Sequence, residues 1–247
     1  MFSATDYDEL YQIMEESPQK KELLTRLLAS HKMDISTISH EIRNPLTLVY
    51  STLQLIESQH PEIASYKHWA EMRRDIEYMK HLLEELSSYN NGEELKRVKT
   101  DMNDYLKKLS LSFAASLLDT DIEFTSKIMP DLPSAYIDVV KMRQVLLNLL
   151  SNAKDAVLAV PHSAAAAITL YAGLHERELR ITITDTGCGI APCDLASIFE
   201  PFVTHKPNGT GLGLAIAKRI IHSHKGSLEV VSEPGRCTSF TVTLPVQ

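Results

Sequence analysis

Two amphipathic stripes in the first third of the chain constrain its fold more than any other feature. The first stripe advances in steps of three and four residues through Ile35, Ile38, Ile42, Leu46, Val49, Leu53 and Ile56. The second advances in the same way through Trp69, Met72, Ile76, Met79, Leu83 and Leu86. Pro61 separates the stripes, and Asn90-Asn91-Gly92 follows the second. Apolar residues at this spacing line one helix face, so residues 34–92 are predicted to form a helical hairpin.

The hairpin is predicted to need a second copy of itself. Two helices with one apolar stripe each bury too little surface to be stable alone. A four-helix bundle built from two chains completes the core, and it predicts a homodimer through the hairpin. The charged segment before it, residues 1–33, is expected to be a helical lead-in or signalling linker.

The hydrophobic period changes after Gly92. Helices are predicted from Asp101 to about Leu118 with Thr100 as N-cap, from Asp138 as cap to about Val160, and from Gly209 to about Ser223. Strands are predicted at residues 121–128, 134–137, 168–172, 178–184, 227–232 and 238–244, with turns at 173–176 and 233–235. Residues 93–247 are therefore predicted to form a two-layer α/β sandwich with a mixed sheet, which makes the whole chain α+β.

Charge and composition limit the classes of partner. The chain has 25 Lys and Arg against 32 Asp and Glu, a formal charge of −7, which argues against nucleic-acid binding. No apolar run approaches the roughly 18–20 residues that span a bilayer, so no transmembrane segment is expected. Three cysteines fit a reducing compartment. We expect a cytoplasmic chain, either by itself or as the cytoplasmic part of a longer membrane-bound sensor.

Glycines alternate along one short segment, Gly209-Thr210-Gly211-Leu212-Gly213-Leu214, at a predicted helix entrance. Such glycines let a ligand approach the backbone, and free N–H groups at a helix start favour an anion. The spacing differs from that of a dinucleotide-binding fingerprint and lacks the Lys of a P-loop. An ordinary turn that starts a helix is the alternative interpretation.

Two further segments place polar groups where an apolar context makes them costly. Asp185 follows an apolar strand and precedes Gly187 and Gly189, so its carboxylate can accept from an exocyclic amine; an Asx turn is the alternative. Asn148, Asn152 and Asp155 share one face of an otherwise apolar helix. The neutral amide oxygens suit Mg²⁺ with bound phosphates; a helix that packs through buried side-chain amides is the alternative.

A fourth segment lies on the first hairpin helix, at Ser39-His40-Glu41-Ile42-Arg43-Asn44-Pro45-Leu46. His40 and Asn44 lie on a face away from the apolar stripe, and Glu41 is beside His40. Imidazole chemistry near neutral pH makes His40 a candidate nucleophile, whereas a solvated surface histidine is the plain alternative.

These segments, in this order, resemble the conserved boxes of bacterial sensor histidine kinases. The resemblance assigns an H box at 40–46, an N box at 148–152, a G1 box at 185–190, an F box at Phe199-Glu200-Pro201-Phe202 and a G2 box at 209–214. It implies a dimerisation and phospho-acceptor hairpin followed by a Bergerat ATP-binding domain. The short lid between Phe202 and Gly209 looks most like the nitrogen-regulation and sporulation kinases.

The resemblance implies a role for each of these residues. His40 would accept the γ-phosphoryl group of ATP, and Glu41 would orient the imidazole and take its proton. Asn152 with Asn148 would hold Mg²⁺, and Asp185 would bind the adenine amine beside Gly187 and Gly189. The phosphates would lie against Lys206 and the backbone of Gly209, Thr210, Gly211, Leu212 and Gly213.

Two details of the resemblance bear on the reaction. Related Bergerat ATPases have a water-activating Glu where this chain has Asn148, and an amide is not a general base, which implies suppressed hydrolysis. Asp155 would organise water around Mg²⁺. Asn44 resembles the residue that positions water to dephosphorylate the receiver domain of a partner response regulator. The rivals are an adaptor without catalysis and a Bergerat ATPase or serine kinase.

Overall fold

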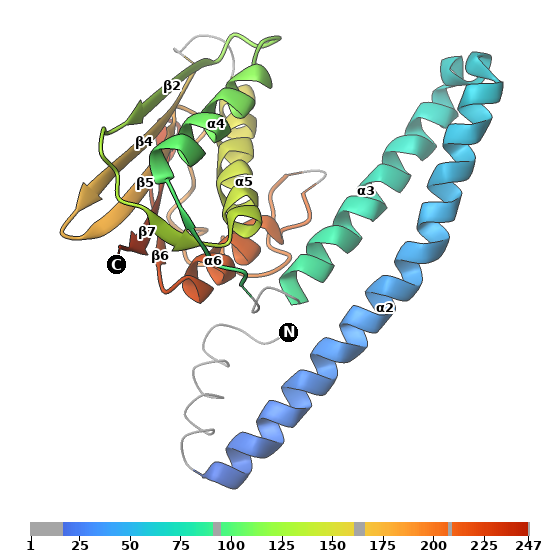
Figure 1. Cartoon of the computed structure of the whole chain (residues 1–247). Helices are drawn as coiled ribbons and strands as arrows, with labels where there is room; N and C mark the ends of the chain where they lie inside the picture. Colours follow the sequence, from blue (N-terminus) through green and yellow to red (C-terminus); the bar gives the residue numbers. More distant parts are fainter. Residues whose placement is uncertain (1–16, 91–94, 161–165, 207–208, 247) are drawn as a thin grey trace. The chain divides into compact units, whose positions relative to one another are not determined.

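The computed structural model describes residues 17–90, 95–160, 166–206 and 209–246. The chain divides into two compact units, one of residues Met1–Asn91 with Thr204–Leu212 and one of Gly92–Val203 with Gly213–Gln247. The start of the expected lead-in, the closing residues of the hairpin at 91–92 and residues 207–208 of the expected lid lie outside the described residues. Figure 1 follows the chain through both units.

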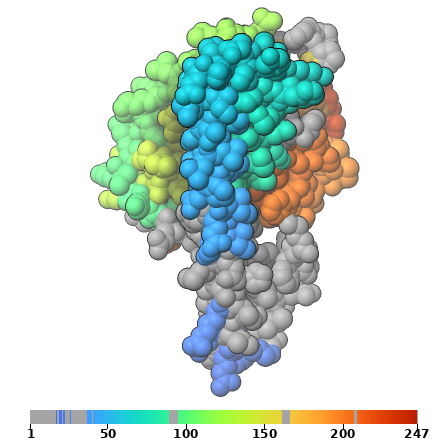
Figure 2. Space-filling model, turned by 90° about the vertical axis from the view of Figure 1, so that its right-hand side faces the viewer, coloured from blue at the N-terminus to red at the C-terminus, as the bar shows by residue number. Residues whose placement is uncertain are grey.

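The predicted helical hairpin is present in the first unit. Helix α2 (Pro18–Gln59) is followed by a 3₁₀ turn, η1 (Pro61–Ser65), and by helix α3 (Lys67–Asn90). The two helices run side by side, α2 in blue and α3 in teal in Figures 1 and 2. Helix α2 starts with Pro18 in its first turn, a position that proline tolerates, and continues without a break past residue 34.

Only part of the apolar stripes is covered within one chain. Leu53, Ile76 and Leu83 are buried between the helices. Other stripe members are half exposed, among them Ile38 at 53%, Ile42 at 49% and Met79 at 44%. The hairpin therefore buries a narrow seam and leaves a second apolar seam accessible.

A polar network joins the two helices near η1. The indole Nε1 of Trp69 donates to Glu57 Oε1 at 2.7 Å. Arg73 donates to both carboxylate oxygens of Glu57 at 3.3 Å and to Glu77 at 3.2 Å. The hydroxyl of Tyr50 reaches the same Glu77 oxygen at 3.5 Å. These contacts fix the register of the two helices at the turn end.

A five-stranded mixed sheet forms the second unit, as predicted. Its order is β2-β4-β5-β7-β6. The strands are β2 (Glu123–Ile128), β4 (Ala167–His175), β5 (Glu178–Asp185), β6 (Ser227–Glu233) and β7 (Cys237–Pro245). Strands β2 and β4 pair in parallel, and the other neighbours pair antiparallel. A separate two-stranded sheet joins β1 (Val98–Thr100) to β3 (Ala135–Ile137).

Three helices cover one face of the five-stranded sheet, which gives the predicted second layer (Figure 1). They are α4 (Met102–Ala115), α5 (Val139–Leu158) and α6 (Gly213–Ser223). The core between the layers contains Leu106, Leu146, Leu149, Ile168, Leu170, Leu179 and Ile181, all at most 1% exposed. Residues alternate along β5 between this core and the uncovered face, as the period of two requires.

Several predicted boundaries are wrong by a few residues. The N-cap of α4 is Asp101 rather than Thr100, because the Asp101 carboxylate accepts from the Asp104 N–H at 3.0 Å. Helix α6 begins at Gly213, four residues after Gly209. The turn between β4 and β5 lies at residues 176–177, both with positive φ. Strand β1 was not predicted.

All three cysteines are free thiols. Within the described ranges, no helix combines the length and apolar character needed to cross a bilayer.

Candidate functional site

Asp185 is a buried carboxylate at the end of β5. It is 2% exposed, and its Oδ1 accepts from the N–H of Gly187 at 2.8 Å, which is the Asx turn of the alternative interpretation. Burial raises the pKa of Asp185 to about 6, while backbone N–H groups of Gly187 and Thr238 act in the opposite direction. A buried acceptor with little other compensation favours a ligand that donates a hydrogen bond.

The loop after Asp185 is held so closely that only glycine fits. A Cβ at Gly187 would lie 2.5 Å from the carbonyl carbon of Ala156 on α5. Gly189 has φ of +68°, and a Cβ there would lie 2.2 Å from the carbonyl oxygen of Glu233. The N–H of Cys188 donates to the carbonyl of Ala156 at 3.2 Å. The loop backbone is therefore held in a fixed position against Ala156 and Glu233.

Helix α5 brings the predicted amide face to the start of α6. The Asp138 carboxylate caps α5 by accepting from the N–H groups of residues 140 and 141. Asn148 is half buried, and a Cβ at Gly213 would lie 2.6 Å from its Oδ1. Asn152 is half buried one turn further on, and Asp155 is exposed. An amide oxygen thus lies beside the first residue of α6.

The glycine-rich segment follows a short looped lid. The hydroxyl of Thr204 accepts from the N–H of Lys206 at 3.1 Å, and the N–H of Gly209 donates to the carbonyl of Lys206 at 3.1 Å. Gly211 has φ of +70°, and Thr210 Oγ1 accepts from the N–H of Leu212 at 3.2 Å. Gly209 and Gly211 therefore shape a loop before α6, and the lysine side chain is exposed.

The predicted F box packs against the sheet. Phe199 meets Phe240 of β7 edge to face at 6.5 Å, and the Lys218 ammonium lies 4.9 Å from the Phe199 ring centroid. Phe202, at the end of this segment, is half exposed and has φ of +66°. Phe199 anchors the segment that leads into the lid, and Phe202 marks its sharp turn.

The candidate acceptor His40 lies in the middle of α2. Its neighbours Glu41 and Asn44 are exposed. Arg43 points to the other helix, where its guanidinium donates to the carbonyl of Leu83 at 3.5 Å. The helix thus presents Glu41 and Asn44 outward while Arg43 joins α3.

The structure brings together some of the predicted residues and adds others. Asp185, Gly187 and Gly189 form one loop, and Asn148 meets Gly213. Sequence reasoning missed three residues that fix this loop: Ala156, Thr238 and Ser232, whose Oγ accepts from the N–H of Ile190 at 2.8 Å. They lie 29 to 53 residues from Asp185 in sequence, and no local pattern indicates them. In the parts of the chain that the structure describes, no three His, Cys, Asp or Glu side chains gather as metal ligands.

Comparison with known proteins identifies two domain families in the chain. Residues 137–247 match the histidine kinase-, DNA gyrase B- and HSP90-like ATPase family. Residues 35–94 match the His Kinase A (phospho-acceptor) domain.

Individual relatives agree with these matches. The signal transduction histidine-protein kinase AtoS of Escherichia coli is 29% identical over 85% of this chain, which spans 34% of AtoS. The sensory histidine kinase/phosphatase NtrB of Rhodobacter capsulatus is 33% identical over 85% of this chain, which spans 60% of NtrB. The crystal structure of full-length ShkA with AMPPNP superposes with a TM-score of 0.73 at 26% identity, covering 86% of this chain and 45% of ShkA. The chain thus spans between a third and two thirds of these proteins, and its two matched domains are those of the sensor histidine kinases of two-component signal transduction.

Proposed function

We propose that the chain is an ATP-dependent protein histidine kinase that phosphorylates itself on His40. Residues 34–92 form the dimerisation and phospho-acceptor domain, residues 93–247 the ATP-binding domain, and residues 1–33 a helical lead-in. The observation that carries the proposal is the buried carboxylate of Asp185 beside a backbone surface that only Gly187 and Gly189 allow. A buried acceptor beside an immobile glycine loop suits adenine, whose amine donates a hydrogen bond and whose ring can pack on the backbone.

The residues present fit ATP with Mg²⁺. A Cβ at Gly187 would collide with Ala156 and one at Gly213 with Asn148, whose amide oxygen lies beside the N-terminus of α6. Asn148 and Asn152 would hold Mg²⁺, while Lys206 and the backbone of residues 209–213 would bind phosphate. Bound Mg²⁺ neutralises phosphate charge, so neutral amide ligands suffice. The helix start adds N–H donors for an anion.

Transfer to the histidine needs little covalent chemistry from the rest of the chain. A ring nitrogen of His40 attacks the γ-phosphorus of ATP, the N–P bond forms, and the bond to the β–γ bridging oxygen breaks as ADP leaves. Glu41 accepts the proton of the other ring nitrogen, which keeps the attacking nitrogen unprotonated. Positioning and charge neutralisation supply most of the rate.

Asn148 cannot activate a water molecule to hydrolyse the nucleotide. Its amide accepts and donates hydrogen bonds but has no basic site that could take a proton from water. Asp155 is exposed at the far end of the same helix face, and we assign it to ordering water around Mg²⁺. The γ-phosphoryl group therefore stays on ATP until the histidine attacks.

The phosphoryl group then passes from His40 to an aspartate of a response regulator, and Asn44 serves the reverse reaction by positioning water on the phosphorylated regulator. Asn44 is exposed on α2, four residues after His40 and so on the same helix face. The relative NtrB is named a kinase/phosphatase, which supports a double activity.

Dimerisation completes the hairpin core. Ile38, Ile42, Val49, Met72 and Met79 are 39% to 53% exposed in one chain. Burying them against the same side chains of a second copy removes apolar surface from water at about 25 cal/mol per Å². A symmetric four-helix bundle satisfies this requirement with one interface.

Labelling with [γ-³²P]ATP tests the acceptor. The wild-type chain should gain an acid-labile, base-stable label, because a phosphoramidate differs from a phosphoserine. His40→Gln should abolish this label and leave nucleotide binding intact. His68→Gln is the matched control, since His68 is exposed on α3, and it should label normally. A label that persists in His40→Gln would refute the proposal, and a base-labile, acid-stable label would favour the serine kinase alternative.

Asn44→Ala separates the two activities. Autophosphorylation should remain within about twofold, because the amide does not touch ATP in this scheme. Decay of the phosphorylated regulator should lose its dependence on the kinase. Unchanged decay with Asn44→Ala would remove the phosphatase role and leave the kinase proposal standing.

A further inference from the structure

His224, at the end of α6, is a buried histidine with both ring nitrogens engaged. It is 5% exposed. Its Nε2 accepts from the backbone N–H of Asp138 at 3.0 Å, and its Nδ1 donates to the carbonyl of Ile220 at 2.8 Å. A backbone N–H only donates and a carbonyl only accepts, so the ring must be neutral with its proton on Nδ1. His224 thereby joins the C-terminus of α6 to the N-terminus of α5.

The groups around the ring shift the pKa of His224 in opposite directions. Burial is the largest influence and lowers the pKa of His224, and the Arg97 guanidinium also lowers it. The Ile220 carbonyl and the Asp138 carboxylate raise it. The net pKa lies below the ordinary value, which agrees with the neutral ring that the hydrogen bonds require.

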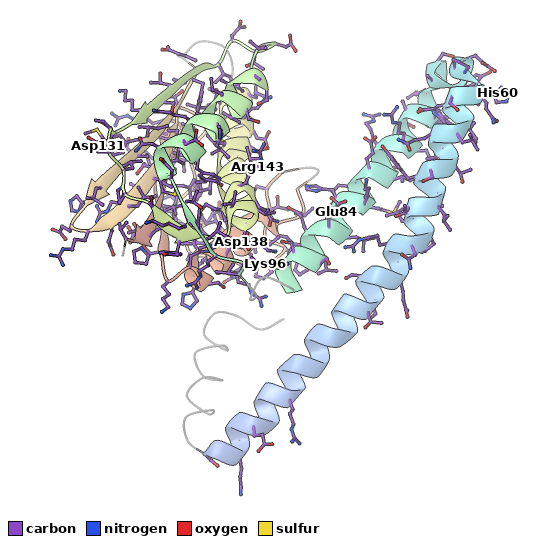
Figure 3. All side chains as sticks on the ribbon, viewed as in Figure 1. His60, Glu84, Lys96, Asp131, Asp138 and Arg143 are labelled. Atoms are coloured by element: carbon purple, nitrogen blue, oxygen red, sulfur yellow. The ribbon has the colours of Figure 1, made fainter. Side chains whose placement is uncertain are left out.

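The same helix ends hold the segment that follows the hairpin. The backbone N–H of Lys96 donates to Asp138 Oδ2 at 2.9 Å, and Figure 3 shows these two residues next to each other. The guanidinium of Arg97 donates to the carbonyl of Ser223, the residue before His224. Two consecutive linker residues are therefore tied to α5 and α6, before the chain enters β1.

Helices α5 and α6 are also the two helices of the candidate nucleotide site. Asn148 lies on α5, and Gly213 starts α6 beside it. The linker contacts lie at the N-cap of α5, Asp138, ten residues before Asn148, and at the last residue of α6, Ser223, ten residues after Gly213. Along each helix, the linker contacts are therefore distant from the residues proposed to bind nucleotide.

We propose that His224, Asp138 and Arg97 form a linker anchor, which positions the ATP-binding domain for phosphoryl transfer to His40 without contributing to nucleotide binding. The inference rests on the proposed function. His224 and Asp138 are positioning residues here, since neither belongs to the nucleotide or acceptor site.

The number of residues between α3 and the first anchored residue gives the anchor its effect. Helix α3 ends at Asn90 and the first anchored residue is Lys96, so five residues (91–95) separate them. Without the Arg97 contact, Lys96 is held by one hydrogen bond to Asp138. Whenever that bond opens, the first held residue is Val98, which pairs with Ile137, and seven residues (91–97) separate it from α3. Two more residues add about 7 Å of reach. Phosphoryl transfer needs reacting atoms within about 3.5 Å, so this slack lowers the share of productive geometries.

Autophosphorylation of the full chain tests the anchor. Arg97→Ala and His224→Leu should lower the labelling rate at saturating ATP by roughly fivefold or more. The dissociation constant of a fluorescent ATP analogue should change by less than twofold. His224→Gln retains a neutral acceptor and donor and should label within twofold of the wild type. Lys99→Ala removes a neighbouring exposed cation on β1 and is the matched control.

Limited trypsin digestion tests the anchor without relying on kinase activity. Cleavage after Lys96 should accelerate in Arg97→Ala and His224→Leu, and it should stay at the wild-type rate in His224→Gln and Lys99→Ala. If His224→Leu does not fold, Arg97→Ala decides the question, because its side chain is exposed. Equal labelling rates in the wild type and Arg97→Ala would overturn the inference, and so would a parallel loss of nucleotide affinity. A wild-type chain that never labels would instead refute the proposed kinase, while trypsin would still report on the anchor.

Discussion

Replacing Asp185 with asparagine should stabilise the nucleotide-free second unit and weaken ATP binding. The carboxylate is 2% exposed, and burial raises its pKa from 3.8 to about 6. The folded state then binds this proton more tightly than the unfolded chain, so the free energy of unfolding falls as pH rises through this range. Well above pH 6 the buried, ionised carboxylate lowers the free energy of unfolding by a constant amount. This amount is (6 − 3.8) × 1.36, or about 3 kcal/mol.

Asparagine removes the charge and keeps one acceptor oxygen. It has one oxygen for the N–H groups of Gly187 and Thr238, where the carboxylate has two. Losing one of these partners costs about 1 kcal/mol. The net gain for Asp185→Asn is therefore about 2 kcal/mol at pH 8. It should fall to zero near about pH 4.5, where the remaining charge cost equals the lost hydrogen bond, and become a small loss at lower pH.

The assay must report on the second unit alone. The single tryptophan, Trp69, lies in the hairpin, so its fluorescence follows the first unit. Pulsed hydrogen exchange of β5 and β7 peptides across a urea series follows the sheet instead. Asp121→Asn makes the same charge change at an exposed position and should have little effect. A gain for Asp185→Asn of equal size at pH 5 and pH 8, or a less stable variant at pH 8, would refute the reasoning.

Other changes test separate features. Gly189→Ala should lower the free energy of unfolding by about 2–3 kcal/mol in thermal melts, because φ is +68° and the Cβ meets Glu233; Gly235→Ala, with φ of +73° but open space, should cost only about 1 kcal/mol. Ile42→Glu should yield monomers in sedimentation, since Ile42 is 49% exposed on the hairpin, and an unchanged dimer would contradict this. Below about pH 6.5 the wild type should lose stability relative to His224→Gln, because the folded-state pKa of His224 is lowered; an identical pH dependence of the two proteins would count against it.

The sequence predicted those elements that are determined by residues close to them in the chain. The N-cap at Asp138 could be recognised because an acidic residue precedes a long apolar helix, and its carboxylate accepts from two N–H groups of the first turn. Thr100 and Asp101 are adjacent and both suit an N-cap, so only the observed hydrogen bond to Asp104 decides between them. The sequence predicts a helix start at Gly209, whereas Gly211 with positive φ keeps the chain in a loop until Gly213.

Features made by distant residues could not be predicted in this way. Strand β1 has three residues, too few for an alternating pattern, and it forms because Val98 pairs with Ile137. His224 was one of ten histidines in the sequence, and its partner N–H at Asp138 is 86 residues away. The family resemblance supplied roles for His40, Asp185 and Asn148, which spacing alone left open between a site and an ordinary turn or helix.

The length and continuity of helix α2 affect how motion can reach His40. A continuous helix of 42 residues is a rod of about 63 Å, and residue 40 lies about 33 Å from its start at Pro18. The helix is continuous over that first half, so a twist applied at its start can be carried toward residue 40. Pro45, five residues further on, removes one backbone donor from the ladder. Helix α2 is therefore stiffer before residue 40 than in the section around Pro45.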